Sequence, residues 1–150
     1  MVEGALIGMA MTSGDSRLLL LANESNELPL VAALMQDAVI HAADIAWKPK
    51  ARRLVLLANR FRWETGDLTR VRAALRIESV TRLQRRDWPR GDAVLALLAV
   101  TAETHGHGSV LTLTFAAGAT LRAEVEAIDL IVEDMSSPWP ALREPHHDTR

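Results

Sequence analysis

The fold is decided by the stretch LVLLANRFRWETGDLTRVRAALRIE, residues 54–78. It contains two segments of alternating apolar and polar residues, 54–64 and 70–78, separated by the turn residues Gly66 and Asp67. Alternation with a period of two places successive side chains on opposite faces of a strand. The short turn between the segments favours antiparallel pairing. We therefore predict a half-exposed antiparallel hairpin.

The same alternation assigns side chains to faces. The aromatic residues Phe61 and Trp63 share one face of the first strand, and Arg60 and Arg62 share the other. In the second strand the apolar residues point inward and the arginines point outward. One basic sheet face is therefore predicted, and its strand arginines are Arg60, Arg62, Arg70, Arg72 and Arg76.

The rest of the chain reads mainly as further strands. Short apolar or β-branched runs bounded by turn residues predict strands at 17–22, 39–47 with a bulge at Ala42-Ala43, 80–86, 93–103, 110–115 and 121–126. Helical spacing of apolar residues, preceded by capping residues and by Pro29 in a first turn, predicts a helix ending at Asp37 or Ala38. A second helix is predicted over 127–135, AIDLIVEDM, with Ile128, Ile131 and Val132 on one face.

This order of elements predicts an α+β fold. Short connections require mainly antiparallel strands, because each parallel pair would need a long crossover. We expect a strongly bent sheet or a partly open barrel, with one helix after the first strand and one C-terminal helix. A pleckstrin-homology-like fold, closed at one end by the C-terminal helix, is the specific version considered.

Length and composition indicate one globular domain. The 150 residues are 49% hydrophobic and 24% charged, which is ordinary for a folded protein. We expect a flexible N-terminal lead over 1–15, the domain over 16–135 and an extended, proline-containing tail over 136–150. The chain has no cysteine, which excludes disulfides and thiolate chemistry.

The sequence predicts a cytoplasmic protein that does not enter a membrane. No Lys or Arg precedes the short apolar run at the N-terminus, so the cationic start of a secretory signal is missing. Charged residues such as Asp37, Asp44 and Arg52 interrupt the apolar windows that could otherwise approach the length of a membrane span.

Charge is distributed unevenly along the chain. Residues 48–90 contain 13 Lys and Arg against four acids, a formal +9, whereas 1–47 carry −5 and 91–150 carry −6, which together give the overall −2. Arginine suits bidentate contacts with phosphate and carboxylate. The candidate anion-binding residues are Arg52, Arg53, Arg60, Arg62, Arg70, Arg72 and Arg76.

Two other interpretations of these arginines stay open. They could pair within the protein with the acidic residues of 122–126 or with Asp129, Glu133 and Asp134. They could also form a seam between copies of the chain. Trp63 and Trp139 are candidate partner-docking residues, although Trp139 could equally pack on the domain itself. Nucleic acid is a weaker candidate partner, because the aromatic side chains near the arginines point to the opposite face and cannot stack bases there.

Signatures of enzymes and metal sites are weak. Asp37, His41 and Asp44 lie close in sequence and could form an acid/base set, but Asp37 also fits a solvated helix end. His105-Gly106-His107-Gly108 and His146-His147 could offer imidazole ligands, yet a polar turn explains the first of them better. Nucleophile-elbow, phosphate-loop, dinucleotide and zinc-protease motifs are absent. We predict no metal site and no cofactor.

Several segments together resemble a known family. LMQDA (34–38), DIAW (44–47), RR (52–53), NRFRWE (59–64) and PWP (138–140) are similar to those of a family of small bacterial, mainly alphaproteobacterial, proteins of unknown function. The resemblance covers residues 17–140. It implies a free-standing domain and no catalytic residue.

The sequence thus predicts a non-enzymatic binding or assembly module, oligomeric with itself, whose arginine-rich strands contact an acidic partner or anionic ligand. A small enzyme with an Asp/His/Arg site and a purely structural homo-oligomer are the alternatives.

Overall fold

The computed structural model describes residues 9–11 and 17–141. The helical elements are the 3-10 turns η1 (Ser25–Glu27), η2 (Ala42–Asp44) and η3 (Ala116–Gly118), and the helix α2 (Leu28–Leu34). The strands are β1 (Met9–Met11), β2 (Leu18–Ala22), β3 (Val39–His41), β4 (Ile45–Lys48), β5 (Arg53–Phe61), β6 (Thr69–Ile77), β7 (Val80–Arg86), β8 (Val94–His105), β9 (Gly108–Phe115), β10 (Thr120–Val125), β11 (Leu130–Asp134) and β12 (Trp139–Pro140).

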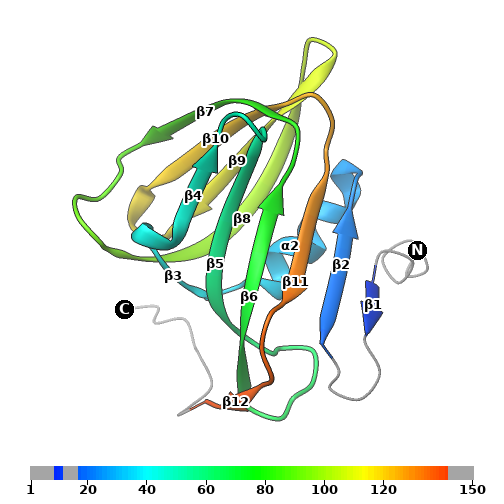
Figure 1. The fold of residues 1–150 in the computed structure, drawn as a ribbon, viewed down its shortest axis with the longest axis vertical. Helices are drawn as coiled ribbons and strands as arrows, with labels where there is room; N and C mark the ends of the chain where they lie inside the picture. The colour runs from blue at the N-terminus through cyan, green and yellow to red at the C-terminus, as the bar shows by residue number, and fades with distance from the viewer. Residues whose placement is uncertain (1–8, 12–16, 142–150) are drawn as a thin grey trace.

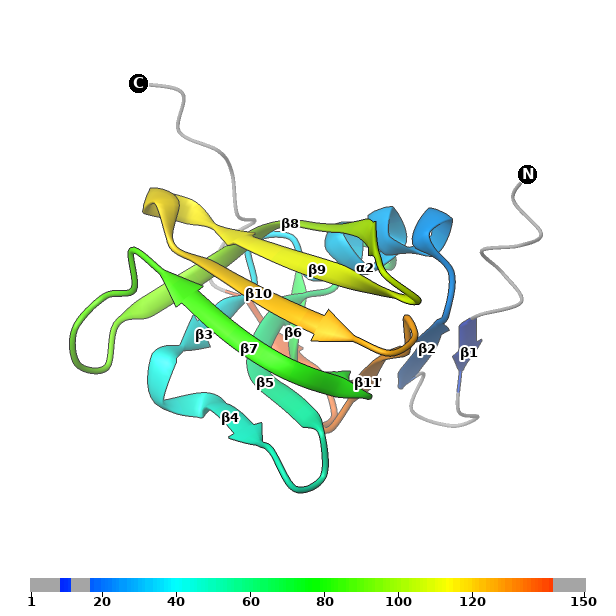
Figure 2. The ribbon, with the colours of Figure 1, turned by 90° about the horizontal axis from the view of Figure 1, so that it is seen from above.

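All strand pairs are antiparallel and belong to one path, β1-β2-β11-β6-β5-β3-β8-β9-β10-β7, with β4 added beside β5 and β12 beside β6. The path bends over itself, so that β7, β10, β9 and β8 form one layer and β4, β5, β6, β11 and β2 form the other (Figures 1 and 2). The two ends of the path, β1 and β7, do not pair with each other, so the sheet is not closed. The predicted antiparallel, open architecture is confirmed.

The predicted helix after the first strand is confirmed, but it is short. Glu27 accepts hydrogen bonds from the backbone N–H groups of Asn23 and Glu24, and Pro29 lies in the first turn of α2, where its missing N–H costs nothing. Leu28, Val31 and Leu34 are buried. α2 ends at Leu34, and the chain then turns through Asp37 at φ 57° into β3.

The predicted C-terminal helix is wrong. Residues 127–135 contain strand β11, which lies between β2 and β6. Leu130, Val132 and Asp134 are buried at alternate positions, a period of two that the helical interpretation overlooked. As a strand, this segment forms backbone hydrogen bonds with β2 on one side and β6 on the other, more than a short isolated helix could form. The pleckstrin-homology comparison is not confirmed, because it rested on a helix at this place.

The register of β5 is the second correction. The core-facing side chains are Leu54, Leu56, Ala58 and Arg60, so Arg60 lies on the buried face and not on the outward one. Opposite them on β6 are Ile77, Leu75, Ala73 and Val71, which are also buried. The core between the two layers combines the apolar β5 side chains and Leu75 and Ile77 of β6 with side chains of α2, β9 and β10. The arginines of β6 face the other way, as predicted.

Candidate anion-binding site

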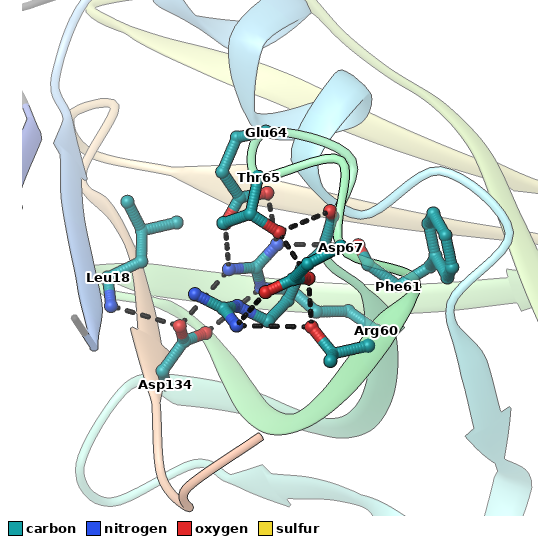
Figure 3. A network of polar contacts seen from close by, with 9 residues as sticks. Leu18, Arg60, Phe61, Glu64, Thr65, Asp67 and Asp134 are labelled. Atoms are coloured by element: carbon teal, nitrogen blue, oxygen red, sulfur yellow. Dashed lines mark hydrogen bonds and ion pairs between the residues drawn. The ribbon is translucent and has the colours of Figure 1, made fainter. Parts of the chain in front are cut away.

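Arg60 forms a buried network at the end of β5. Its side chain is fully enclosed and extends across β6 to Asp134 of β11, with Nε to Oδ1 at 2.9 Å and Nη2 to Oδ2 at 3.1 Å. The same guanidinium donates to Glu64, at 3.0 Å from Nη1 and 2.7 Å from Nη2 (Figure 3). A longer bond of 3.5 Å from Nη1 to the Phe61 carbonyl occupies its last donor. All donors of this guanidinium are therefore used within the protein.

The network joins four neighbouring strands. Asp134 lies opposite Ala73 of β6, which lies opposite Ala58 of β5, and these small side chains leave room for the guanidinium to pass. On its other side Asp134 accepts a hydrogen bond of 2.9 Å from the backbone N–H of Leu18 in β2. One carboxylate thus connects β2 and β11 to β5, over β6.

Arg60 and Glu64 both have shifted pKa values, and each shift favours the charged form of the side chain. Burial opposes the Arg60 charge, but the hydrogen bonds that Arg60 donates to Glu64 and Asp134, and the charges of these two carboxylates, outweigh it and raise the pKa of Arg60. Burial likewise disfavours the ionised Glu64, yet the hydrogen bonds and charge of Arg60 lower the pKa of Glu64 below its ordinary 4.5. Removing one member of such a buried pair typically costs about 3–5 kcal/mol. The Arg60 network therefore has a structural role.

Arg62 is also used internally. It is buried, and its Nη1 lies 3.1 Å from Thr69 Oγ1 and 3.4 Å from Asp67 Oδ2. Thr65 and Thr69 each donate to Asp67 Oδ1 at 2.6 Å, and these hydrogen bonds lower the pKa of Asp67. The β5–β6 turn is thus organised around Asp67, which Figure 3 places beside the Arg60 network.

The arginines on the outward face of β5 and β6 also have partners. Arg53 Nε donates to Glu78 at 2.8 Å, and Arg76 Nε lies 3.7 Å from the same carboxylate. Arg72 bonds to Asp44, at 3.3 Å, and to the Asn59 side chain.

The remaining two predicted arginines follow the same pattern. Arg70 donates to the Asn59 carbonyl at 3.0 Å and lies over the Phe61 ring, and partial burial lowers the pKa of Arg70. Arg52 pairs with Glu126 at 2.6 Å. The sequence predicted one basic sheet face, but the structure separates its members between the core and the outward face and supplies an internal partner for each. Their role in anion binding stays a prediction that the geometry does not support.

A different group of arginines is free of such partners. Among the described residues, the side chains of Arg86, Arg90 and Arg122 make no hydrogen bond or ion pair, and the side chain of Arg85 contacts only the ring of Trp88, at 6.0 Å. All four are exposed. Arg86 and Arg122 lie on the outer face of β7 and β10, because Arg86 pairs with Thr120 and Arg122 with Gln84. We call Arg85, Arg86, Arg90 and Arg122 the arginine edge.

Two shallow hollows border the arginine edge, and Arg85 lines both. The first, about 540 Å³, lies over the outer face and is lined by Gln84, Arg85, Arg86, Asp87, Thr112, Gly118, Thr120 and Arg122. The second, about 420 Å³, lies at the end of β7 and is lined by Ala42, Ala43, Arg85, Trp88, Pro89, Arg90, Gly91 and Asp92. Trp88 is anchored there by an edge-on contact with Phe115 at 5.8 Å. Cations and hydrogen-bond donors around an open hollow suit a carboxylate or phosphate group.

Two of the three acid/base candidates, His41 and Asp44, have ion-pair partners outside the candidate set. Asp44 pairs with Arg72, and His41 Nδ1 lies 3.8 Å from Asp92. His105 begins the predicted hairpin turn to Gly108 and lies 3.6 Å from Glu124. Within residues 9–11 and 17–141, no three His, Asp or Glu side chains come together as a metal site. His146 and His147 lie outside the described residues.

The two tryptophans proposed for docking differ. Trp63 packs edge-on against Phe61 at 4.7 Å and donates from Nε1 to the Gln36 carbonyl at 3.0 Å, so it holds the end of α2 against β5. Trp139 is exposed in β12, opposite Arg70 of β6. Only Trp139 offers surface to a partner.

Comparison with protein families assigns most of the chain to one family. The model of a family described as "Protein of unknown function (DUF2948)" matches residues 18–147. The chain belongs to DUF2948. The resemblance to a family of unknown function is thereby confirmed, and DUF2948 assigns no activity to the chain. No curated protein and no solved structure matches it. In the described part of this DUF2948 member, no helix has the length and apolar character to cross a bilayer.

The sequence analysis predicted neither the buried position of Arg60 nor the arginine edge. Leu54, Leu56 and Ala58 precede Arg60 at intervals of two, and this pattern could have placed Arg60 in the core. Three members of the arginine edge, Arg85, Arg86 and Arg90, lie within the +9 segment and Arg122 lies outside it, and no local pattern distinguishes Arg86 from Arg72. The definition of the arginine edge depends on which arginines find acidic partners across the sheet.

Proposed function

We propose that this DUF2948 domain is a non-catalytic binding module that holds an anionic partner at the arginine edge. The observation behind the proposal is that Arg86 and Arg122, diagonal neighbours on the outer face of β7 and β10, have no acidic partner among the described residues. Each of the seven arginines singled out from the sequence has an internal partner. Unpaired exposed cations keep their charge available to a ligand.

Two features argue against the alternatives. A catalytic role for Asp37, His41 and Asp44 would need them to converge on a pocket, and none of the three lines either hollow of the arginine edge. Nucleic acid would gain from exposed aromatic rings for base stacking, and the only aromatic residue lining these hollows, Trp88, is half-buried against Phe115. Homo-oligomerisation, partner docking by Trp139 and a cytoplasmic location stay predictions.

The proposal is tested by salt-dependent retention on heparin at pH 7. The test variant is Arg86→Gln/Arg122→Gln, and the matched control is Arg53→Gln/Arg72→Gln, which removes the same charge from residues that are paired internally. We expect the test variant to elute at lower salt than the wild type, and the control to elute close to the wild type.

Two results contradict the proposal. Equal shifts for both variants mean that only net charge matters, and absence of retention for the wild type means that the arginine edge does not hold a polyanion. Circular dichroism and urea unfolding check that each variant is folded before the comparison.

A further inference from the structure

The outer edge of β7 has no strand partner among residues 9–11 and 17–141. In this part of the chain β7 is the last strand of the sheet and pairs only with β10. At its start the Val80 N–H donates to the Arg52 carbonyl at 2.9 Å. Beyond this point, residues 81–86 make no backbone hydrogen bond to any described element other than β10. A strand in this position presents a row of free N–H and C=O groups that can pair with another chain.

We propose that this edge accepts an extended acidic segment of a partner protein as an additional strand. The inference rests on the proposed function, since the acidic side chains of the added strand would be held by the arginine edge. In this mode of recognition the main chain supplies hydrogen bonds and alternate side chains supply specificity.

Charge complementarity selects an acidic occupant. Residues 80–90 carry four Arg against one Asp, a formal +3, in a chain whose overall charge is −2. Arg82 is paired with Glu124 of β10 at 3.7 Å, and the other three belong to the arginine edge. Arg86 and Arg122 lie on the outer face beside the edge, and Arg85 opposes Leu121, whose side chain faces the core. Successive side chains of an added strand point to opposite faces. Acidic residues at alternate positions of the added strand would therefore contact Arg86 and Arg122 on the outer face. An acidic residue at a position in between would point to the opposite face and contact Arg85.

The end of the edge also offers apolar surface. The hollow of about 420 Å³ includes Ala42, Ala43, Trp88 and Pro89 beside Arg85 and Arg90. A side chain on the inner face of an added strand would pass this hollow, so a small apolar residue fits between the acidic ones.

The arrangement exceeds what protection of an edge requires. Natural proteins place charges on edge strands to prevent aggregation, and the arginines of β7 would serve that purpose. Arg122, however, is on β10, one strand inside the edge, and Arg90 follows β7 beside the hollow. Acidic residues are interspersed here, with Asp87 and Asp92 lining the hollows. This spacing suits separate carboxylates better than a continuous phosphate backbone.

The experiment uses an acetylated, amidated eight-residue peptide in which glutamate alternates with valine and threonine. Its matched control is a depsipeptide with the same side chains and charge, in which esters replace the amides of the four central residues, so that N–H donors are lost on both edges. Affinities for the full chain are measured by calorimetry. Hydrogen exchange follows the amides of residues 81–86.

If the edge pairs with the peptide, the depsipeptide binds at least about tenfold more weakly, because several main-chain hydrogen bonds are lost. The amides of residues 81–86 become more protected from hydrogen exchange on peptide binding. The Arg86→Gln/Arg122→Gln variant binds the peptide more weakly than the wild type does, but the difference in affinity between peptide and depsipeptide is unchanged.

Equal affinity of peptide and depsipeptide overturns strand addition, while arginine-dependent heparin retention would leave the proposed function standing. If the peptide does not bind and heparin retention is intact, strand addition is likewise overturned and the proposed function stands. Loss of both overturns both ideas. Sedimentation of the protein alone supplies a further test, because a dimer that protects residues 81–86 and excludes the peptide would assign the edge to a second copy of the chain.

Discussion

The arginines of β5 and β6 and those of the arginine edge have the same chemistry but opposite surroundings. In the first region the strand neighbours and the adjoining turns supply carboxylates, so that Arg60 meets Asp134 and Glu64, and Arg72 meets Asp44. In the second region Arg86 and Arg122 face Thr120, Gln84 and Thr112 across the ladder. An arginine contributes to stability in one place and remains available to a ligand in the other, according to what lies opposite it.

The largest expected difference in stability between the two regions is that caused by Arg60→Met. The substitution keeps most of the aliphatic volume but leaves Asp134 and Glu64 without their cation. We expect the free energy of unfolding to fall by about 3–5 kcal/mol. Urea denaturation measures the change, and Arg86→Met, at an exposed and unpaired site, should stay within about 0.5 kcal/mol of the wild type. Similar losses for the two variants would remove the distinction between the regions.

A double-mutant cycle sharpens the same point. Asp134→Leu alone should be destabilising, because it strands the Arg60 charge and the Leu18 N–H. In Arg60→Met/Asp134→Leu the Arg60–Asp134 pair is removed as a unit and, of the charged groups, only the more accessible Glu64 loses its partner, so the loss should be smaller than the sum of the single losses by about 0.5–3 kcal/mol. Additive losses in urea unfolding would mean that the two side chains act independently.

Acid should weaken the first region through Glu64. Its pKa is below the ordinary 4.5 in the folded protein, mainly because the hydrogen bonds and charge of Arg60 outweigh burial. A carboxyl with a depressed folded pKa stabilises the protein above its unfolded pKa, and this contribution is lost as pH falls through the folded value. Stability measured from pH 6 downward should therefore decline below about 4.5 more steeply in the wild type than in Glu64→Gln. Parallel declines would contradict this.

The smallest expected effect is at the outward face. Arg72 and Asp44 are each about one-third exposed, and exposed ion pairs contribute about 0–1 kcal/mol. Arg72→Gln should lower the free energy of unfolding by no more than this amount, and 0.5 M salt should reduce the difference. A loss as large as that of Arg60→Met would show that the outward face is as tightly coupled as the core.

Particular segments show how far the sequence leads. Strand-period alternation in 70–78 correctly predicted β6 and its outward arginines. In 54–64 both sets of alternating residues contain apolar side chains. The aromatic residues Phe61 and Trp63 favoured the set that does not face the core along most of β5. In 127–135 a five-residue strand is too short for its period to outweigh a helical spacing of Ile128, Ile131 and Val132. These errors have one cause, because both segments are amphipathic in more than one way.

The sequence by itself determined the class of the fold, the antiparallel pairing, the helix after the first strand and the concentration of positive charge in 48–90. These follow from local periodicity, turn residues and composition. Only the tertiary structure decided which arginines are neutralised, because Asp134 is 74 residues from Arg60 and Asp44 is 28 from Arg72. Pairing across a sheet depends on register, and a shift of one residue moves every side chain to the other face. The identity of the arginine edge is therefore a property of the assembled sheet.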